Sequence, residues 1–159
     1  GIVSPEEFFY PLDAIRNWNR IYGKEGFTQH QAVLPASKGR AAVRRFLELL
    51  TSLGGASFLC VLKDCGAEGS GMLSFPMPGT SIALDLALRE HTQEHIDRLN
   101  ELVIREGGRI YLTKDALTRP EHFAQMEPRL SAWQSVRNKW DPMHRVRSAQ
   151  SVRLFGDKP

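Results

Sequence analysis

The chain has 159 residues, of which 42% are hydrophobic and 25% are charged, and its formal net charge is +3. These values are ordinary for one globular domain and exclude a disordered chain, and the small positive excess does not indicate a nucleic-acid-binding protein. No apolar run approaches the roughly 20 residues that a membrane-spanning helix needs. Because the chain does not begin with methionine and no signal peptide is recognisable, we expect residues 1–159 to be a single domain of a longer cytoplasmic polypeptide.

Hydrophobic periodicity predicts two strand–helix–strand units between residues 27 and 114, after a short amphipathic N-terminal segment. The predicted elements are strands at 27–34, 57–64, 80–88 and 109–113, helices at 37–53 and 91–106, and C-terminal helices at 121–126 and 128–140 with one last turn after Pro142. We expect Ser37 to cap the first of these helices. A βαββαβ order predicts an α+β, ferredoxin-like fold: one antiparallel sheet with two helices on one face, plus a helical C-terminal segment.

The two cysteines, Cys60 and Cys65, lie five positions apart in the second predicted strand. Their side chains should point to opposite faces of the sheet and cannot form a disulfide with each other. We therefore expect two reduced thiols, as is usual in the cytoplasm.

Two short motifs resemble known sites only in their letters. The glycines at 66, 69 and 71 lead into another strand, whereas a phosphate-binding loop leads into the N-terminus of a helix. His91, Glu94 and His95 match a zinc-hydrolase pattern, but they open an ordinary packing helix, where an acidic residue in the first turn is common. Neither motif predicts a site by itself.

The sheet face that the helices leave open carries mostly uncharged polar groups. Strand alternation places Gln29, Gln31, Lys63, Ser81 and Ala83 on this face. Amides and a hydroxyl suit hydrogen bonding to a sugar or a heterocycle, although a plain solvent-exposed face explains the pattern equally well. Lys114 follows the last strand, where the end of a sheet can present a side chain to a cleft, but a surface lysine is the simpler interpretation.

Several motifs occur together in one order along the chain. They are Phe8-Phe9-Tyr10-Pro11-Leu12-Asp13, Trp18-Asn19-Arg20-x-Tyr22-Gly23, Gly26-Phe27-x-Gln29-x-Gln31, Ser57-Phe58-Leu59-x-Val61-x-Lys63, Leu73-Ser74-Phe75-Pro76-x-Pro78-Gly79, Gly107-Gly108-Arg109-Ile110-Tyr111, Lys114-Asp115, Trp133-x-x-Val136-Arg137-x-Lys139 and Asp141-Pro142. As an ordered set they are far more specific than any single piece. Over nearly its whole length the chain resembles the C-terminal substrate (cap) domain of FAD-linked oxidases of the vanillyl-alcohol-oxidase type.

This resemblance implies a function and a division of labour. In that family a preceding domain holds FAD, the sheet of the cap domain covers the isoalloxazine ring, and a hydride passes from a carbinol carbon of the sugar to flavin N5. The implied partners are the protein's own upstream FAD-binding domain and a small-molecule or lipid-linked sugar, with membrane association if the substrate is lipid-linked and no role for nucleic acid. Without the upstream domain, the chain is expected to be inactive and to hold no flavin tightly.

The resemblance also implies roles for individual residues. Lys114 matches a catalytic lysine that contacts flavin and substrate, and Tyr111 matches the tyrosine beside it. Residues at positions that line the substrate pocket are Tyr10, Gln29, Gln31, Lys63, Cys65, Ser81 and Ala83. The last three depart from the family, where an aromatic residue, an asparagine and a cysteine stand at the positions of Cys65, Ser81 and Ala83 respectively.

Two other classes of function stay open on the sequence. A stand-alone ferredoxin-like module could bind a small ligand or RNA, but RNA-binding versions display aromatic residues on the central strands, where this chain has Gln29 and Gln31. A zinc hydrolase would rest on His91 and His95 alone.

Overall fold

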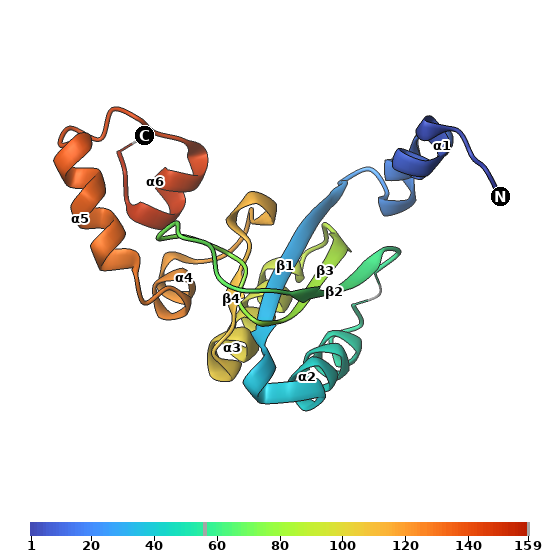
Figure 1. Cartoon of the computed structure of the whole chain (residues 1–159), viewed down its shortest axis with the longest axis horizontal. Coiled ribbons are helices and arrows are strands. Elements are labelled where there is room, and N and C mark those ends of the chain that lie inside the picture. The colour runs from blue at the N-terminus through green and yellow to red at the C-terminus, as the bar shows by residue number, and fades with distance from the viewer. Residues whose placement is uncertain (56, 159) are drawn as a thin grey trace.

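The structure, a computed structural model, describes residues 1–55 and 57–158. Its centre is a four-stranded sheet with the order β2-β3-β1-β4, in which all neighbouring strands are antiparallel (Figure 1). The strands are β1 Phe27–Pro35, β2 Cys60–Cys65, β3 Gly79–Ala87 and β4 Arg109–Ile110. The predicted α+β class with an antiparallel sheet is confirmed.

Two helices cover one face of this sheet. Helix α2 (Gly39–Ser52) connects β1 to β2, and helix α3 (Thr92–Glu106) connects β3 to β4. The side chain of His30 on β1 meets both helices, because its ring lies 5.9 Å from that of Phe46 and its Nε2 lies 2.9 Å from Asn100 Oδ1. Alternate residues of β1 and β3 face these helices, so their apolar side chains form the core.

The core side chains are large, apolar and shielded from water. Those no more than 2% exposed include Leu34, Phe46, Ile82, Leu84, Ile96, Leu99 and Val103. Burying each side chain of this size contributes about 1.5–3 kcal/mol, so the contact between the sheet and its two helices stabilises the fold.

Several predicted boundaries were wrong by one to three residues, and three of them have a local reason. Helix α2 begins at Gly39 and not at Ser37, because Gly39 has a φ of +60° that separates the helix from a preceding 3₁₀ turn. Strand β2 begins three residues late, because the hydroxyl of Ser57 accepts the backbone N–H of Asp85 in place of a ladder bond. Strand β4 stops at Ile110: the N–H of Tyr111 still donates to Gln31 O at 2.8 Å, and a 3₁₀ turn over Leu112–Lys114 follows.

The two ends of the chain form arms on either side of the sheet (Figure 1). Helix α1 (Pro5–Phe9), which the sequence did not predict, belongs to the N-terminal arm. Helix α4 (Pro120–Met126) packs against the body of the domain, with Phe123 and Met126 in the hydrophobic core, and the C-terminal arm beyond it contains α5 (Leu130–Trp140) and α6 (Ala149–Phe155). Helix α6 is longer than the single turn predicted there, because Ser148 and Ser151 form a capping box at its start.

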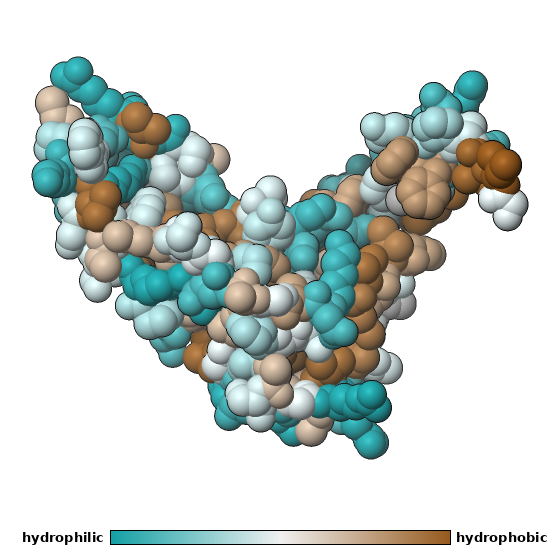
Figure 2. Space-filling view, viewed as in Figure 1, coloured by the Kyte–Doolittle hydropathy of each residue, from teal (hydrophilic) through white to brown (hydrophobic). Residues whose placement is uncertain are grey.

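Between the arms the molecular surface is hollowed, and hydrophobic side chains are visible on the N-terminal arm (Figure 2). The strongly exposed apolar side chains of that arm are Ile2, Val3, Phe8, Phe9 and Tyr10. No helix of the described residues is long and apolar enough to cross a membrane. Both cysteines are free thiols, as expected.

The glycine-rich loop between β2 and β3 is attached to β4 by an ion pair and a hydrogen bond of Arg109. Arg109 of β4 donates to Glu68 Oε1 and to the carbonyl of Ser74 at 2.5 and 2.8 Å. Phe75 in the same loop stacks on Tyr111 with ring centroids 4.6 Å apart. The loop therefore packs beside β4, and it does not lead into a helix.

Candidate functional site

The face of the sheet opposite α2 and α3, which we call the open face, carries polar side chains from three strands. Directly opposite residues of an antiparallel pair lie on the same face. The opposite pairs on this face are Gln29 with Asp85, Gln31 with Ala83, and Lys63 with Ser81. The predicted register of these side chains is confirmed, while their binding roles stay predictions.

A chain of side-chain hydrogen bonds crosses this face and reaches Lys114. Lys114 Nζ donates to Gln29 Oε1 at 2.8 Å, and Gln29 Nε2 donates to Asp85 Oδ1 at 2.8 Å. The hydroxyl of Tyr22 donates to Asp85 Oδ2 at 2.9 Å. We call these four residues, Tyr22, Asp85, Gln29 and Lys114, the polar network.

Lys114 enters the network because of the turn after β4. The 3₁₀ turn over Leu112–Lys114 carries the lysine next to β1, and the N–H of Lys114 bonds the carbonyl of Tyr111 at 2.9 Å. The lysine side chain is half-buried. The structure thus brings together Lys114 and Gln29, which the sequence singled out, although they are far apart along the chain.

Asp85 and Tyr22 are site residues that sequence reasoning missed. Their exposed fractions are only 2% and 7%. Burial raises the pKa of Tyr22 to about 12, and the Asp85 carboxylate, by accepting its hydrogen bond and by its charge, acts in the same direction. Tyr22 therefore stays a neutral hydrogen-bond donor at physiological pH. A carboxylate on an otherwise uncharged strand face was the signal in the sequence that could have pointed to Asp85.

An aromatic cluster holds Tyr22 in place. Its ring stacks on Phe27 with centroids 4.5 Å apart, and it meets Phe58 and Trp18 edge-on at 5.4 and 6.1 Å. Such aromatic pairs contribute about 0.5–1.5 kcal/mol each beyond area burial. The N-terminal segment is thereby fixed at the end of the sheet that carries Asp85.

Two other predicted residues lie near the network and have defined partners. Gln31 Nε2 donates to Ser81 Oγ at 2.9 Å, so these two side chains form a second polar pair on the open face. The backbone of Tyr111 is joined to Gln31, while its ring stacks on Phe75. Ala83, whose side chain is small, lies directly opposite Gln31 on β3.

The remaining predicted site residues lie away from the polar network. Tyr10 is 62% exposed at the end of α1, and its nearest ring partner is Phe9, at 6.5 Å, so the structure does not bring it to the sheet. Cys65 is opposite Gly79 at the far end of β2. Lys63 is exposed on the edge strand.

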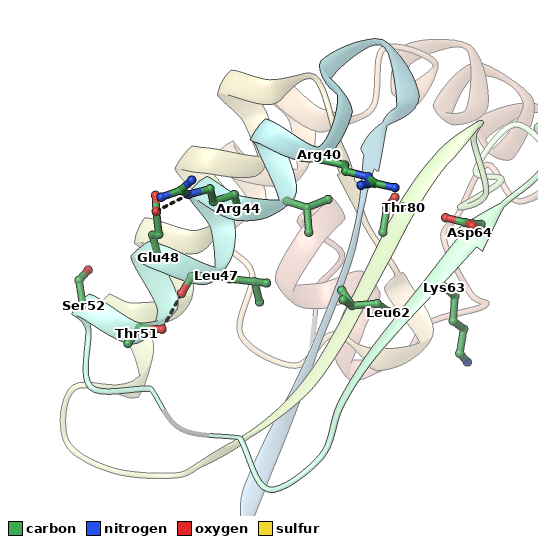
Figure 3. A pocket seen from close by; sticks show the side chains of 11 residues that line it. Arg40, Arg44, Leu47, Glu48, Thr51, Ser52, Leu62, Lys63, Asp64 and Thr80 are labelled. Carbon is green, nitrogen blue, oxygen red and sulfur yellow. Dashed lines mark hydrogen bonds and ion pairs between the residues drawn. The ribbon is translucent and has the colours of Figure 1, made fainter.

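Two hollows differ in how they relate to these residues. The larger, about 890 Å³, lies between α2 and the edge strand β2; Figure 3 shows Leu47 and Leu62 in it, with Arg40, Arg44 and Glu48 along the helix. Of the predicted site residues, its lining includes Lys63 and none of the polar network. The smaller hollow, about 340 Å³, combines Gln29, Asp85 and Tyr22 with an apolar lining of Ile15, Trp18, Ile21, Phe58 and Leu59. The chemistry of the site therefore points to the smaller hollow.

The zinc interpretation finds no support in the geometry. His91 is exposed, and its Nδ1 lies 4.0 Å from Glu94 Oε2. In residues 1–55 and 57–158, no group of three or more His, Cys, Asp or Glu side chains is placed to hold a metal ion.

Comparison with known proteins shows what the chain as a whole is similar to. No protein-family model matches the chain. The chain is 37% identical over 139 residues to decaprenylphosphoryl-β-D-ribose oxidase of Mycolicibacterium smegmatis, an alignment that covers 86% of this chain and 29% of that enzyme. It is also 33% identical over 101 residues, 63% of its length, to an uncharacterized protein in the mprA 5′ region of Streptomyces coelicolor, of which the alignment covers 28%.

The chain thus spans less than a third of the length of these curated relatives. A match over most of this chain and a small part of the relative is what one domain of a larger oxidase produces. The resemblance to FAD-linked oxidases is therefore confirmed: over most of its length the chain is similar to a part of decaprenylphosphoryl-β-D-ribose oxidase, which is consistent with a C-terminal domain of such an oxidase.

Proposed function

We propose that the chain is the substrate-binding cap domain of an FAD-dependent oxidoreductase that oxidises a carbinol carbon of a sugar or another alcohol. The observation that carries the proposal is the polar network, in which the Lys114 ammonium is held at the open sheet face by Gln29. The similarity to an enzyme named as a decaprenylphosphoryl-β-D-ribose oxidase supports the same reading.

Two half-buried side chains of the open face suit a hydroxylated substrate. Gln31 and Lys114 supply an amide and an ammonium group, which together can donate hydrogen bonds to sugar hydroxyls and accept them. Ser81, which is only 1% exposed, accepts the Gln31 amide at 2.9 Å, so the orientation of Gln31 is set before a ligand arrives. In this proposal Gln31 and Lys114 bind and orient the substrate, and a domain seated on the open face excludes water.

The residues present fit one side of a flavin ring. A half-buried ammonium suits a ring that gains negative charge on reduction, and Lys114 is such a group. Bound FAD would supply the acceptor for the hydride of the carbinol carbon. In the described part of the chain the glycine-rich loop packs on β4, and β3 follows it, so we assign the holding of the FAD phosphates to the protein's own upstream domain.

The proposal predicts that the full-length protein purifies with flavin and that carbinols reduce it. Mixed anaerobically with ribose-containing alcohols, it should lose its flavin absorption band and form one keto product per flavin. The matched control is this chain alone, which should neither retain stoichiometric flavin nor turn over. A flavin-loaded protein whose absorption no sugar or alcohol carbinol changes would contradict the proposed reaction, and stoichiometric flavin in this chain alone would contradict the placement of the cofactor.

A further inference from the structure

The side-chain amide of Gln29 can adopt two orientations that differ by exchange of its oxygen and nitrogen. Its two neighbours decide between them. An ionised carboxylate only accepts hydrogen bonds and an ammonium only donates them. Asp85 must therefore face the amide nitrogen, and Lys114 must face the amide oxygen. The structure shows this orientation, with hydrogen bonds of 2.8 Å from Gln29 Nε2 to Asp85 and from Lys114 to Gln29 Oε1.

Asp85 can set this orientation because it is itself fixed. It is 2% exposed, and its second carboxylate oxygen accepts the hydroxyl of Tyr22. Its backbone N–H donates to Ser57 Oγ at 3.0 Å. Because the aromatic cluster holds Tyr22, the carboxylate has one position from which to bind Gln29.

We propose that Asp85, held by Tyr22, is a positioning residue that orients the Gln29 amide so that its carbonyl holds the Lys114 ammonium at the open face. An ammonium has three N–H donors, and among the described residues Gln29 is its hydrogen-bond partner. The orientation of Lys114 toward a ligand is thus determined by a carboxylate that does not touch it. The consequence for catalysis rests on the proposed function, whereas the positioning itself does not.

Substitution of Asp85 separates geometry from charge. Asp85→Ala removes the acceptor that fixes the Gln29 nitrogen, so the amide can rotate and release Lys114. Asp85→Asn removes the charge but can keep the geometry, because the asparagine oxygen can face Gln29 while its NH₂ donates to the Tyr22 hydroxyl, which also accepts. Asp64→Ala, at an exposed carboxylate on β2, is the matched control.

The measurement is the rate at which acetic anhydride acylates Lys114 in the full-length protein, read by mass spectrometry with Lys139 as internal reference. We expect Asp85→Ala to raise the Lys114 rate about five- to tenfold, the equilibrium equivalent of losing one hydrogen bond. We expect the rate to stay within about twofold of wild type in Asp85→Asn and to be unchanged in Asp64→Ala. A wild-type rate of Lys114 labelling in Asp85→Ala would overturn the proposal. Equal increases of this rate in Asp85→Ala and Asp85→Asn would also overturn it, because they would show that the charge of Asp85, and not its geometry, controls Lys114.

Two further measurements complete the test. If Asp85→Ala does not fold, Tyr22→Phe replaces it: this variant keeps the ring but releases one carboxylate oxygen, and it should raise Lys114 labelling above that of Asp85→Asn. Labelling equal to wild type in Tyr22→Phe would then overturn the proposal. In the folded variants, Asp85→Ala should lower kcat with little change in KM, and Asp85→Asn should recover it. If labelling behaves as expected in a protein without oxidase activity, the proposed function fails and the positioning stands.

Discussion

In the full-length oxidoreductase that we propose, replacing Lys114 by alanine is expected to slow flavin reduction by about 10²- to 10³-fold, as removal of one preorganised charge-stabilising donor does. Lys114 lies in a turn outside the hydrophobic core, and within the described part of the chain its side chain donates to Gln29. The fold should therefore persist while the transition state loses its cation. Stopped-flow anaerobic reduction measures the step directly, and circular dichroism verifies the fold.

Two further variants make the Lys114 result interpretable. Lys114→Arg keeps the charge but should not restore the rate, because a planar guanidinium does not replace a compact ammonium held by one carbonyl. Lys139→Ala, at an exposed lysine of α5, should reduce flavin at the wild-type rate. A wild-type rate in Lys114→Ala would mean that this lysine is an ordinary surface residue.

Replacing Gly79 by alanine is expected to lower the free energy of unfolding by about 2–4 kcal/mol, the range for overpacking a close contact in a core. A Cβ at Gly79 would lie 2.0 Å from the carbonyl oxygen of Leu34 and 3.0 Å from Pro35 Cα. These atoms belong to β1, which pairs with β3 here, so the two central strands would have to separate. Urea unfolding of wild type and variant gives the difference.

The matched control is Gly66→Ala, in the loop between β2 and β3, where a Cβ would meet nothing within 4 Å. Its free energy of unfolding should change by no more than about 0.5 kcal/mol. Equal stabilities of the two alanine variants would contradict the tight β1–β3 contact at Gly79.

Much of the fold could be predicted because it follows from the spacing of hydrophobic residues and from the order of strands and helices along the chain. Helical spacing identified α2 and α3, and alternation placed Gln29 and Gln31 on the face away from them, where the structure has them. The boundaries that were wrong depend on single contacts, such as the Ser57 hydroxyl that takes the place of a ladder bond at the start of β2.

The site was less predictable because it is assembled by tertiary contacts. Tyr22 meets Asp85 only when the N-terminal segment packs its aromatic rings against the end of the sheet, and no local pattern encodes that packing. Lys114 was identified by resemblance, but its hydrogen bond to Gln29 could not be predicted, because it depends on how the turn after β4 places the lysine beside β1. Tyr10 is the opposite case. The resemblance implied that it lines the pocket, whereas its ring contact in this structure is with Phe9 in the N-terminal arm.

A crystal structure of the full-length protein with flavin bound tests the proposed placement of Lys114 most directly. We expect the isoalloxazine ring to lie against the open face of the β2-β3-β1-β4 sheet, with Lys114 Nζ within hydrogen-bonding distance of the ring. A flavin ring bound on the α2 and α3 side of the sheet, or out of reach of Lys114, would contradict it.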